Sequence, residues 1–235
     1  MMHARIVGIG WVTASGIGQG RRGDVFAMPQ GPLPAVSRKD LFADPYPRFG
    51  RLDDFSRLGL AGIALALGDA GLDQWEEKRN VGLFAGTVGG CLATDMDYFD
   101  SVLPQGGALA SPNLFAYTLS NTFLGEAAIR FGLVGPSFVA NLNDGNRLGC
   151  LQLALESLHW GECDVALAGF CELSLDKHIA QNGHHGTVFL VLSKESADSS
   201  QSYGVFGLDE KGTFFLDQHI VSDWPQLVAA FKRNS

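Results

Sequence analysis

The chain has 235 residues, of which 46% are apolar and 18% charged, with 17 Lys and Arg against 25 Asp and Glu. This length fits one large domain or two small ones with a substantial hydrophobic core. The formal net charge of −8 argues against nucleic acid or an anionic membrane as the main partner. In an average soluble domain about 25% of residues are charged. The lower fraction of charged residues here predicts that the fold, or a partner, buries much of the helix and sheet surface.

The sequence gives no sign of targeting or of a metal site. No apolar run approaches the roughly 18 residues that span a bilayer, and glycine and polar residues interrupt the N-terminal segment before a signal-peptide core forms. Cys91, Cys150, Cys163 and Cys171 form no CxxC pair and have no histidine at metal-ligand spacing. We therefore expect a cytoplasmic protein with reduced, buried thiols and no metal or cofactor. Cys91, after a glycine-rich turn, is the one thiol considered for reactivity.

The N-terminal part predicts a strand, an irregular segment and a buried helix. The first strand is predicted over residues 4–9, and residues 11–50, rich in Gly and Pro, are predicted to be irregular. Asp53 and Ser56 favour the start of a helix. Because residues 58–70 are apolar on nearly every face, this helix is expected to be buried on nearly every face.

The rest of the chain predicts further strands and helices in alternation. Strands are predicted over residues 80–85, 137–143, 164–169, 187–192 and 213–216. Helices are predicted after Ser111, over 123–131 and over 148–160. Apolar strands that alternate with buried helices are typical of an α/β sheet covered on both faces. With no repeat and no obvious linker, we expect a single domain.

Several motifs with known chemistry are incomplete here. Gly8 and Gly10 follow a strand, but Thr13 stands where a dinucleotide-binding motif needs its third glycine. There is no P-loop, and Ser137 does not lie in a GxSxG elbow. His184 and His185 are adjacent, and adjacent side chains on an extended segment point to opposite faces, so we do not expect them to bind one ion.

Two other features stay open to more than one interpretation. The glycine turn over residues 86–90 exposes backbone N–H groups that are able to bind an anion, although close helix–strand packing is the preferred interpretation. Asp144 lies between a predicted strand and a predicted helix. Nucleophiles are presented at such junctions in α/β enzymes, and an Asp is also what a helix N-cap needs. The residues alone favour the capping role.

Taken in order, the motifs resemble the N-terminal half of β-ketoacyl synthases, the thiolase-fold condensing enzymes of fatty acid and polyketide assembly. The matching segments are residues 7–13, 56–72, 81–90, 111–136, 161–169 and, more weakly, 183–192. The resemblance covers residues 4–193 and implies an α/β, thiolase-like half-fold with a mixed, mostly parallel sheet. It places the whole chain, 1–235, in one ketosynthase-like N-terminal domain, with residues 194–235 as a C-terminal extension.

Two departures from the family bear on function. Counting back from Gly161 places Asp144 where the family has its nucleophilic cysteine, and Cys150 is expected about two turns into the helix. A carboxylate there cannot form the transferable thioester. We also find no counterpart of the family's second half, which supplies two histidines for decarboxylative condensation, and His184, His185 and His219 stand in no matching motif. We therefore expect no catalytic activity from the isolated chain.

This combination is similar to chain-length factors, the catalytically silent ketosynthase-like subunits of type II polyketide systems, and most of all to half-length proteins of bacterial aryl polyene pathways. The resemblance implies a full-length β-ketoacyl synthase as partner and an acyl carrier protein as an indirect one. It implies that one uncharged strand lies at the interface, with Ser137, Phe138, Val139, Ala140, Asn141, Leu142 and Asn143 as candidate contacts. A strand edge left bare is expected to be covered.

Three hypotheses follow. The first is a non-catalytic partner of a ketosynthase, which would be insoluble or self-associating when expressed alone. The second is an acyl-thioester decarboxylase or hydrolase with Asp144 as base, with His184 or His185 assisting it. The third, a decayed fragment, conflicts with the well-patterned helices. Without the second half, a helix or sheet face is expected to lie bare unless a partner covers it.

Overall fold

The computed structural model of the chain describes residues 1–142, 147–173, 185–194 and 202–231. The strands are β1 (Met2–Thr13), β2 (Gly16–Gln19), β3 (Val81–Thr87), β4 (Ser137–Asn141), β5 (Val165–Glu172), β6 (Gly186–Ser193), β7 (Val205–Leu208), β8 (Phe214–Leu216) and β9 (His219–Val221). The α-helices are α1 (Arg38–Leu41), α2 (Asp54–Asp69), α3 (Leu92–Val102), α4 (Pro112–Phe115), α5 (Thr122–Phe131), α6 (Gly149–Trp160) and α7 (Trp224–Phe231). Short 3₁₀ helices are η1 (Gly20–Arg22), η2 (Pro47–Arg51) and η3 (Leu103–Gln105).

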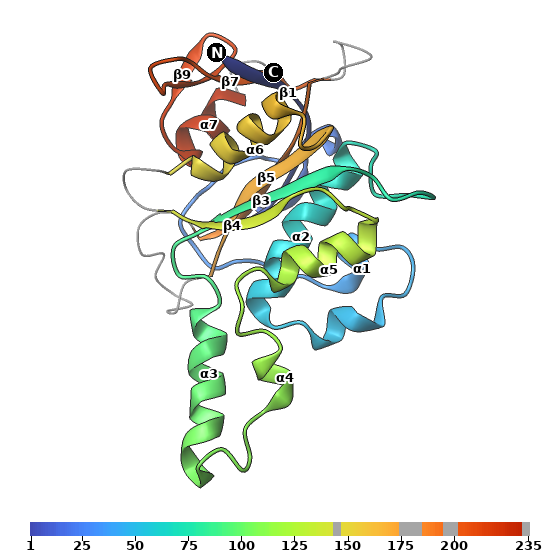
Figure 1. Ribbon diagram of the computed structural model, residues 1–235, viewed down its shortest axis with the longest axis vertical. Coiled ribbons are helices and arrows are strands. Elements are labelled where there is room, and N and C mark those ends of the chain that lie inside the picture. Colours follow the sequence, from blue (N-terminus) through green and yellow to red (C-terminus); the bar gives the residue numbers. More distant parts are fainter. Residues whose placement is uncertain (143–146, 174–184, 195–201, 232–235) are drawn as a thin grey trace.

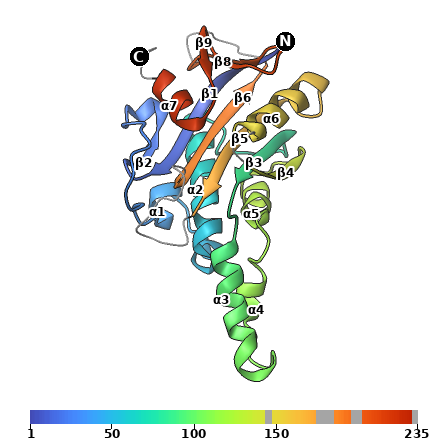
Figure 2. The same ribbon diagram turned by 90° about the vertical axis from the view of Figure 1, so that its left-hand side faces the viewer.

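All of these strands belong to one sheet, in the order β4-β3-β5-β6-β1-β7-β8-β9, with β2 paired to β1 (Figures 1 and 2). β4, β3 and β5 are parallel, and β6 runs antiparallel between β5 and β1. From β4 to β1, every strand except β6 therefore shares one direction, which agrees with the predicted mixed, mostly parallel sheet. The pairs made by β2, β7, β8 and β9 are antiparallel, so antiparallel pairs outnumber parallel ones among the described strands.

Helices cover both faces of the sheet, as predicted (Figure 2). One hydrophobic cluster joins α2 and α5 to one face, and a second joins α6 and α7 to the other. Side chains alternate along a strand, so Leu83 and Ala85 of β3 enter the first cluster while Phe84 between them enters the second. The helical pair α3 and α4 projects away from these layers (Figures 1 and 2).

Helix α2 confirms the prediction of a helix that is buried nearly all round. Its N-cap, Asp53, accepts a hydrogen bond from the backbone N–H of Ser56 at 3.0 Å. Gly10 of β1 faces this helix, and a Cβ added there would lie 2.2 Å from the backbone nitrogen of Ala66. The absence of a side chain at Gly10 therefore allows β1 and α2 to approach closely.

The structure corrects the prediction that residues 11–50 are irregular. β1 continues through Trp11 to Thr13 and turns back into β2, with Gly16 at φ +134° just after the turn. The β-branched residues Val12, Thr13 and Ile17 favour this hairpin. Likewise, the predicted turn over residues 86–90 begins later, because Gly86 and Thr87 still belong to β3. No helix or strand is predicted from local patterns at the positions of α3, β7, β9 and α7.

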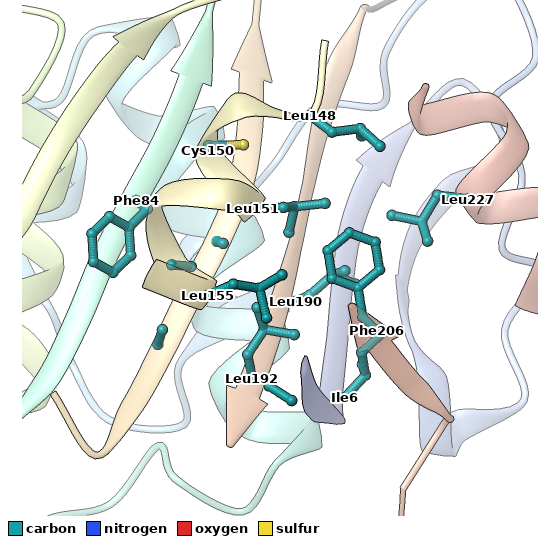
Figure 3. Close-up of a cluster of buried hydrophobic side chains, with 14 of the residues drawn as sticks. Ile6, Phe84, Leu148, Cys150, Leu151, Leu155, Leu190, Leu192, Phe206 and Leu227 are labelled. Carbon is teal, nitrogen blue, oxygen red and sulfur yellow. The ribbon is translucent and has the colours of Figure 1, made fainter. Parts of the chain in front are cut away.

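The C-terminal segment, residues 203–231, covers the face of the sheet beside α6. Leu227 of α7 and Phe206 of β7 lie on the same side of the sheet as Leu151 and Leu155 of α6 (Figure 3), and all are fully buried or nearly so. The ring of Trp224 lies 5.0 Å from that of Phe170 on β5. The expectation of a bare face is therefore wrong for this side of the sheet, because the chain's own C-terminal segment packs on it.

Candidate functional site

The carboxyl ends of three neighbouring parallel strands meet at one end of the sheet. Thr87, Asn141 and Glu172 are the last residues of β3, β4 and β5. Just beyond β4, the Leu142 N–H donates to the backbone oxygen of Thr87 at 2.8 Å. The predicted site residues Asn143 and Asp144 lie outside the described residues, which resume before α6. In α/β folds, sites form at such strand ends.

The glycine-rich turn after β3 does bind an anion, and the anion is a side chain of the same protein. The backbone N–H groups of Val88 and Gly89 donate to the two carboxylate oxygens of Glu172, at 2.6 Å and 2.9 Å. The Thr87 hydroxyl donates to the same carboxylate at 3.0 Å. Close packing, the preferred interpretation of this turn, is therefore incomplete. Its N–H groups also bind the end of β5 and so connect that strand to the segment that leads into α3.

Replacing Glu172 with glutamine is expected to lower the free energy of unfolding by about 1–3 kcal/mol. The carboxamide loses the negative charge and turns an NH₂ donor toward N–H groups that need acceptors. Urea unfolding followed by circular dichroism measures the effect. Glu210→Gln, at an exposed position, removes the same charge and should change stability by less than about 0.5 kcal/mol. Equal effects of the two substitutions would contradict the role given to Glu172.

Strand β4 carries most of the predicted interface residues and forms an edge of the described sheet. Pro136 and Leu142 direct backbone groups to β3. Because backbone polar groups alternate sides along a strand, Ser137, Val139 and Asn141 direct theirs to the open edge. Phe138 is 53% exposed, although its ring lies 6.0 Å from that of Phe84. Leu142 is buried.

The cysteines are all free and buried, as predicted. Cys150 lies in the first turn of α6, closer to its start than the two turns expected, and burial raises the pKa of its thiol to about 12. Cys91 stands at the N-cap of α3, but burial raises the pKa of its thiol too. Because the thiolate is the nucleophile, burial disfavours the reactive form of both thiols.

The remaining predicted site residues are two adjacent histidines. His185 is partly buried, and burial lowers its pKa; His184 lies outside the described residues. In residues 1–142, 147–173, 185–194 and 202–231, no group of three or more His, Cys, Asp or Glu side chains is placed to hold a metal ion. Within the same ranges, no helix combines the length and the hydrophobicity that crossing a lipid bilayer requires.

Solved structures that align with this chain include ketosynthases. The type II polyketide synthase complex of AntDE and AntF, an acyl-carrier protein with its ketosynthase bound to the hexaketide, aligns with a TM-score of 0.65 at 15% identity, over 87% of this chain and 68% of that one. The ishigamide ketosynthase/chain length factor aligns with a TM-score of 0.63 at 18% identity, over 85% and 64%. The fold is thus a thiolase-like ketosynthase half-fold, as the resemblance implied.

Sequence comparison identifies the family to which the chain belongs. The family model of the β-ketoacyl synthase N-terminal domain matches residues 35–202, more than half of the chain, and the protein therefore belongs to this family. The pikromycin polyketide synthase component PikAII of Streptomyces venezuelae is 27% identical over 164 residues, 65% of this chain and 4% of that protein. Polyketide synthase PksL of Bacillus subtilis (strain 168) is 32% identical over 100 residues, 42% and 2%. The chain thus matches only a small part of either relative.

Proposed function

We propose that this protein is a non-catalytic, chain-length-factor-like subunit that pairs with an active, full-length β-ketoacyl synthase. The observation that carries the proposal is the outer edge of β4, beside which no other described strand pairs, together with the exposed ring of Phe138. Asp144 stands where the family has its nucleophilic cysteine, and a carboxylate cannot form the transferable thioester. This substitution supports a non-catalytic role. The whole chain, including residues 194–235, acts as one domain in this proposal.

Two of the similar solved structures suggest the pathway in which this protein acts. One is described as a ketosynthase/chain length factor and another as a ketosynthase in complex with an acyl-carrier protein. By analogy, the partner ketosynthase carries the chemistry and receives the acyl carrier protein, which this chain meets only indirectly. The product is a polyketide, an aryl polyene or a fatty acid, made in the cytoplasm.

Pairing through β4 also has a physical basis. An edge strand presents unpaired N–H and C=O groups, and a second strand beside it satisfies them. Residues 137–142 contain no charged side chain that would block such pairing. Exposed Phe138 then becomes buried between the subunits, where an aromatic side chain contributes strongly to binding.

Phe138→Glu is expected to abolish co-purification with the ketosynthase, because a buried, unpaired charge at an interface costs several kcal/mol. The isolated variant should keep its circular dichroism spectrum and thermal midpoint, since the side chain is already half exposed. Ile220→Glu is the matched control, because Ile220 lies on β9, far from β4 in the sheet order, and is 73% exposed. The pairing surface would lie elsewhere if the two variants co-purified equally well.

The alternative function, an acyl-thioester decarboxylase or hydrolase, rests on the carboxylate of Asp144 at a strand–helix junction. It predicts that the purified protein turns over malonyl or acyl thioesters and that Asp144→Asn abolishes this turnover. The non-catalytic proposal predicts that Asp144→Asn leaves both the complex and the pathway product unchanged. The two functions are therefore separated by one substitution.

A further inference from the structure

Helix α3 carries an apolar stripe that no described part of the chain covers. Leu92, Met96, Phe99 and Leu103 are 44%, 54%, 59% and 60% exposed. They follow one another at spacings of four, three and four residues, the spacing that aligns side chains along one face of a helix and forms the seam of a coiled coil. At 1.5 Å per residue the stripe is about 16 Å long.

The opposite side of α3 is already occupied by α4. The ring of Tyr98 lies 5.4 Å from that of Phe115, and the Ser101 hydroxyl accepts a hydrogen bond from the backbone N–H of Ser111 at 3.1 Å. The projection is therefore a helical pair (Figure 2) that uses one face of α3 internally, whereas the side chains of the apolar stripe are exposed.

The charges beside the stripe are all negative. Asp95 and Asp100 occupy the two positions that flank the seam, which correspond to g and e of a coiled coil. No Lys, Arg or His occurs between Arg79 and Arg130, so nothing on the projection offsets these carboxylates. Flanking charges of this kind set partner choice, because opposite charges across the seam attract and like charges repel.

We propose that the α3 stripe docks a helix of a different protein, one with an apolar seam flanked by Lys or Arg. A second copy of this chain is disfavoured there, because its own α3 would place Asp95 and Asp100 opposite identical carboxylates in either orientation. If the partner is the β-ketoacyl synthase of the proposed function, the α3 stripe is a second contact with it, beside β4. The inference rests on the proposed function only for this identity of the partner.

Two synthetic helical peptides test the stripe without the ketosynthase. Both carry leucine at a and d; one has lysine at every e and g position and the other has glutamate. Like charges at e and g keep each peptide from pairing with itself. Fluorescence anisotropy with the full chain should show binding of the lysine peptide, weakened by salt, and at least about tenfold weaker binding of the glutamate peptide.

Two variants and a control sharpen this test. Phe99→Glu should remove binding of the lysine peptide, whereas Ile220→Glu should leave it unchanged. The double variant D95K/D100K should reverse the preference and favour the glutamate peptide. Equal binding of both peptides, or binding of neither, would overturn the inference. Neither result would bear on pairing through β4, which the Phe138 variant tests separately.

Discussion

Trp224→Ala is expected to lower the free energy of unfolding by about 3–5 kcal/mol, the usual cost of removing a large buried ring. Trp224 begins α7, is fully buried and packs on Phe170 of β5. The substitution therefore leaves a cavity between the C-terminal segment and the sheet. Urea unfolding followed by circular dichroism should show a lower midpoint, and the dye ANS should bind to the loosened surface beside α6.

Trp224→Phe is the informative comparison for this prediction. Among the described residues, the indole Nε1–H of Trp224 is buried without a hydrogen-bond partner, and such a group carries a desolvation penalty. Phenylalanine removes the donor while keeping most of the ring, so it should cost much less than alanine. If both substitutions left stability unchanged, residues 203–231 would not be an integral cover of α6.

Asp69→Ala is expected to have a comparable effect, about 2–5 kcal/mol, because it leaves three donors, one in a buried and two in partly buried hydrogen bonds, without their acceptor. The Asp69 carboxylate accepts from the backbone N–H groups of Ile9 and Arg21, at 2.9 Å and 2.6 Å, and from the Tyr203 hydroxyl at 2.8 Å. It thereby links the C-terminal end of α2 to β1, η1 and the C-terminal segment. A carboxylate at a helix C-terminus is disfavoured by the helix dipole, so these hydrogen bonds explain its presence.

Two milder substitutions separate the contributions of the three hydrogen bonds to stability. Tyr203→Phe removes one hydrogen bond and should cost about 1 kcal/mol. Asp69→Asn should fall between Tyr203→Phe and Asp69→Ala, since one carboxamide oxygen remains as an acceptor. Asp164→Asn, at an exposed carboxylate, is the control for lost charge. An Asp69→Ala protein as stable as this control would show that the three hydrogen bonds contribute nothing to stability.

Much of the sheet and its buried helices could be predicted from local patterns. The unbroken apolar run after Asp53 required burial on all sides, and the structure places α2 between β1 and α5 with nearly every residue buried. The glycines at positions 132 and 161 follow α5 and α6 with positive φ, as helix-ending residues do. These elements are specified by residues close in sequence.

The elements that were missed depend on distant contacts. The hairpin of β1 and β2 lies in a stretch that Gly and Pro make irregular by composition. β7 is only four residues long, and its stability comes from pairing with β1, some 200 residues earlier in the chain. α3 has an apolar face, but that face is exposed and does not pack in the core. Its stripe from Leu92 to Leu103 was nevertheless visible in the sequence as a four-three-four spacing.

The candidate site was predicted only in part. The uncharged, β-rich segment 137–143 predicted strand β4, which ends at Asn141, and the place of this strand at an interface stays a prediction of the resemblance. Glu172 was missed because the predicted strand ended at Gly169, three residues too early. Only the tertiary fold brings this carboxylate to the N–H groups of the turn after Thr87. The role of Asp144 stays a prediction, as that residue lies outside the described ranges.

The proposal that this protein is a non-catalytic partner of an active ketosynthase is tested most directly by co-expression. The second protein is the full-length β-ketoacyl synthase encoded nearest to this one. Size-exclusion chromatography with light scattering should give a stable one-to-one complex, whereas this chain expressed alone should self-associate. A well-behaved monomer that elutes apart from the ketosynthase would contradict the proposal.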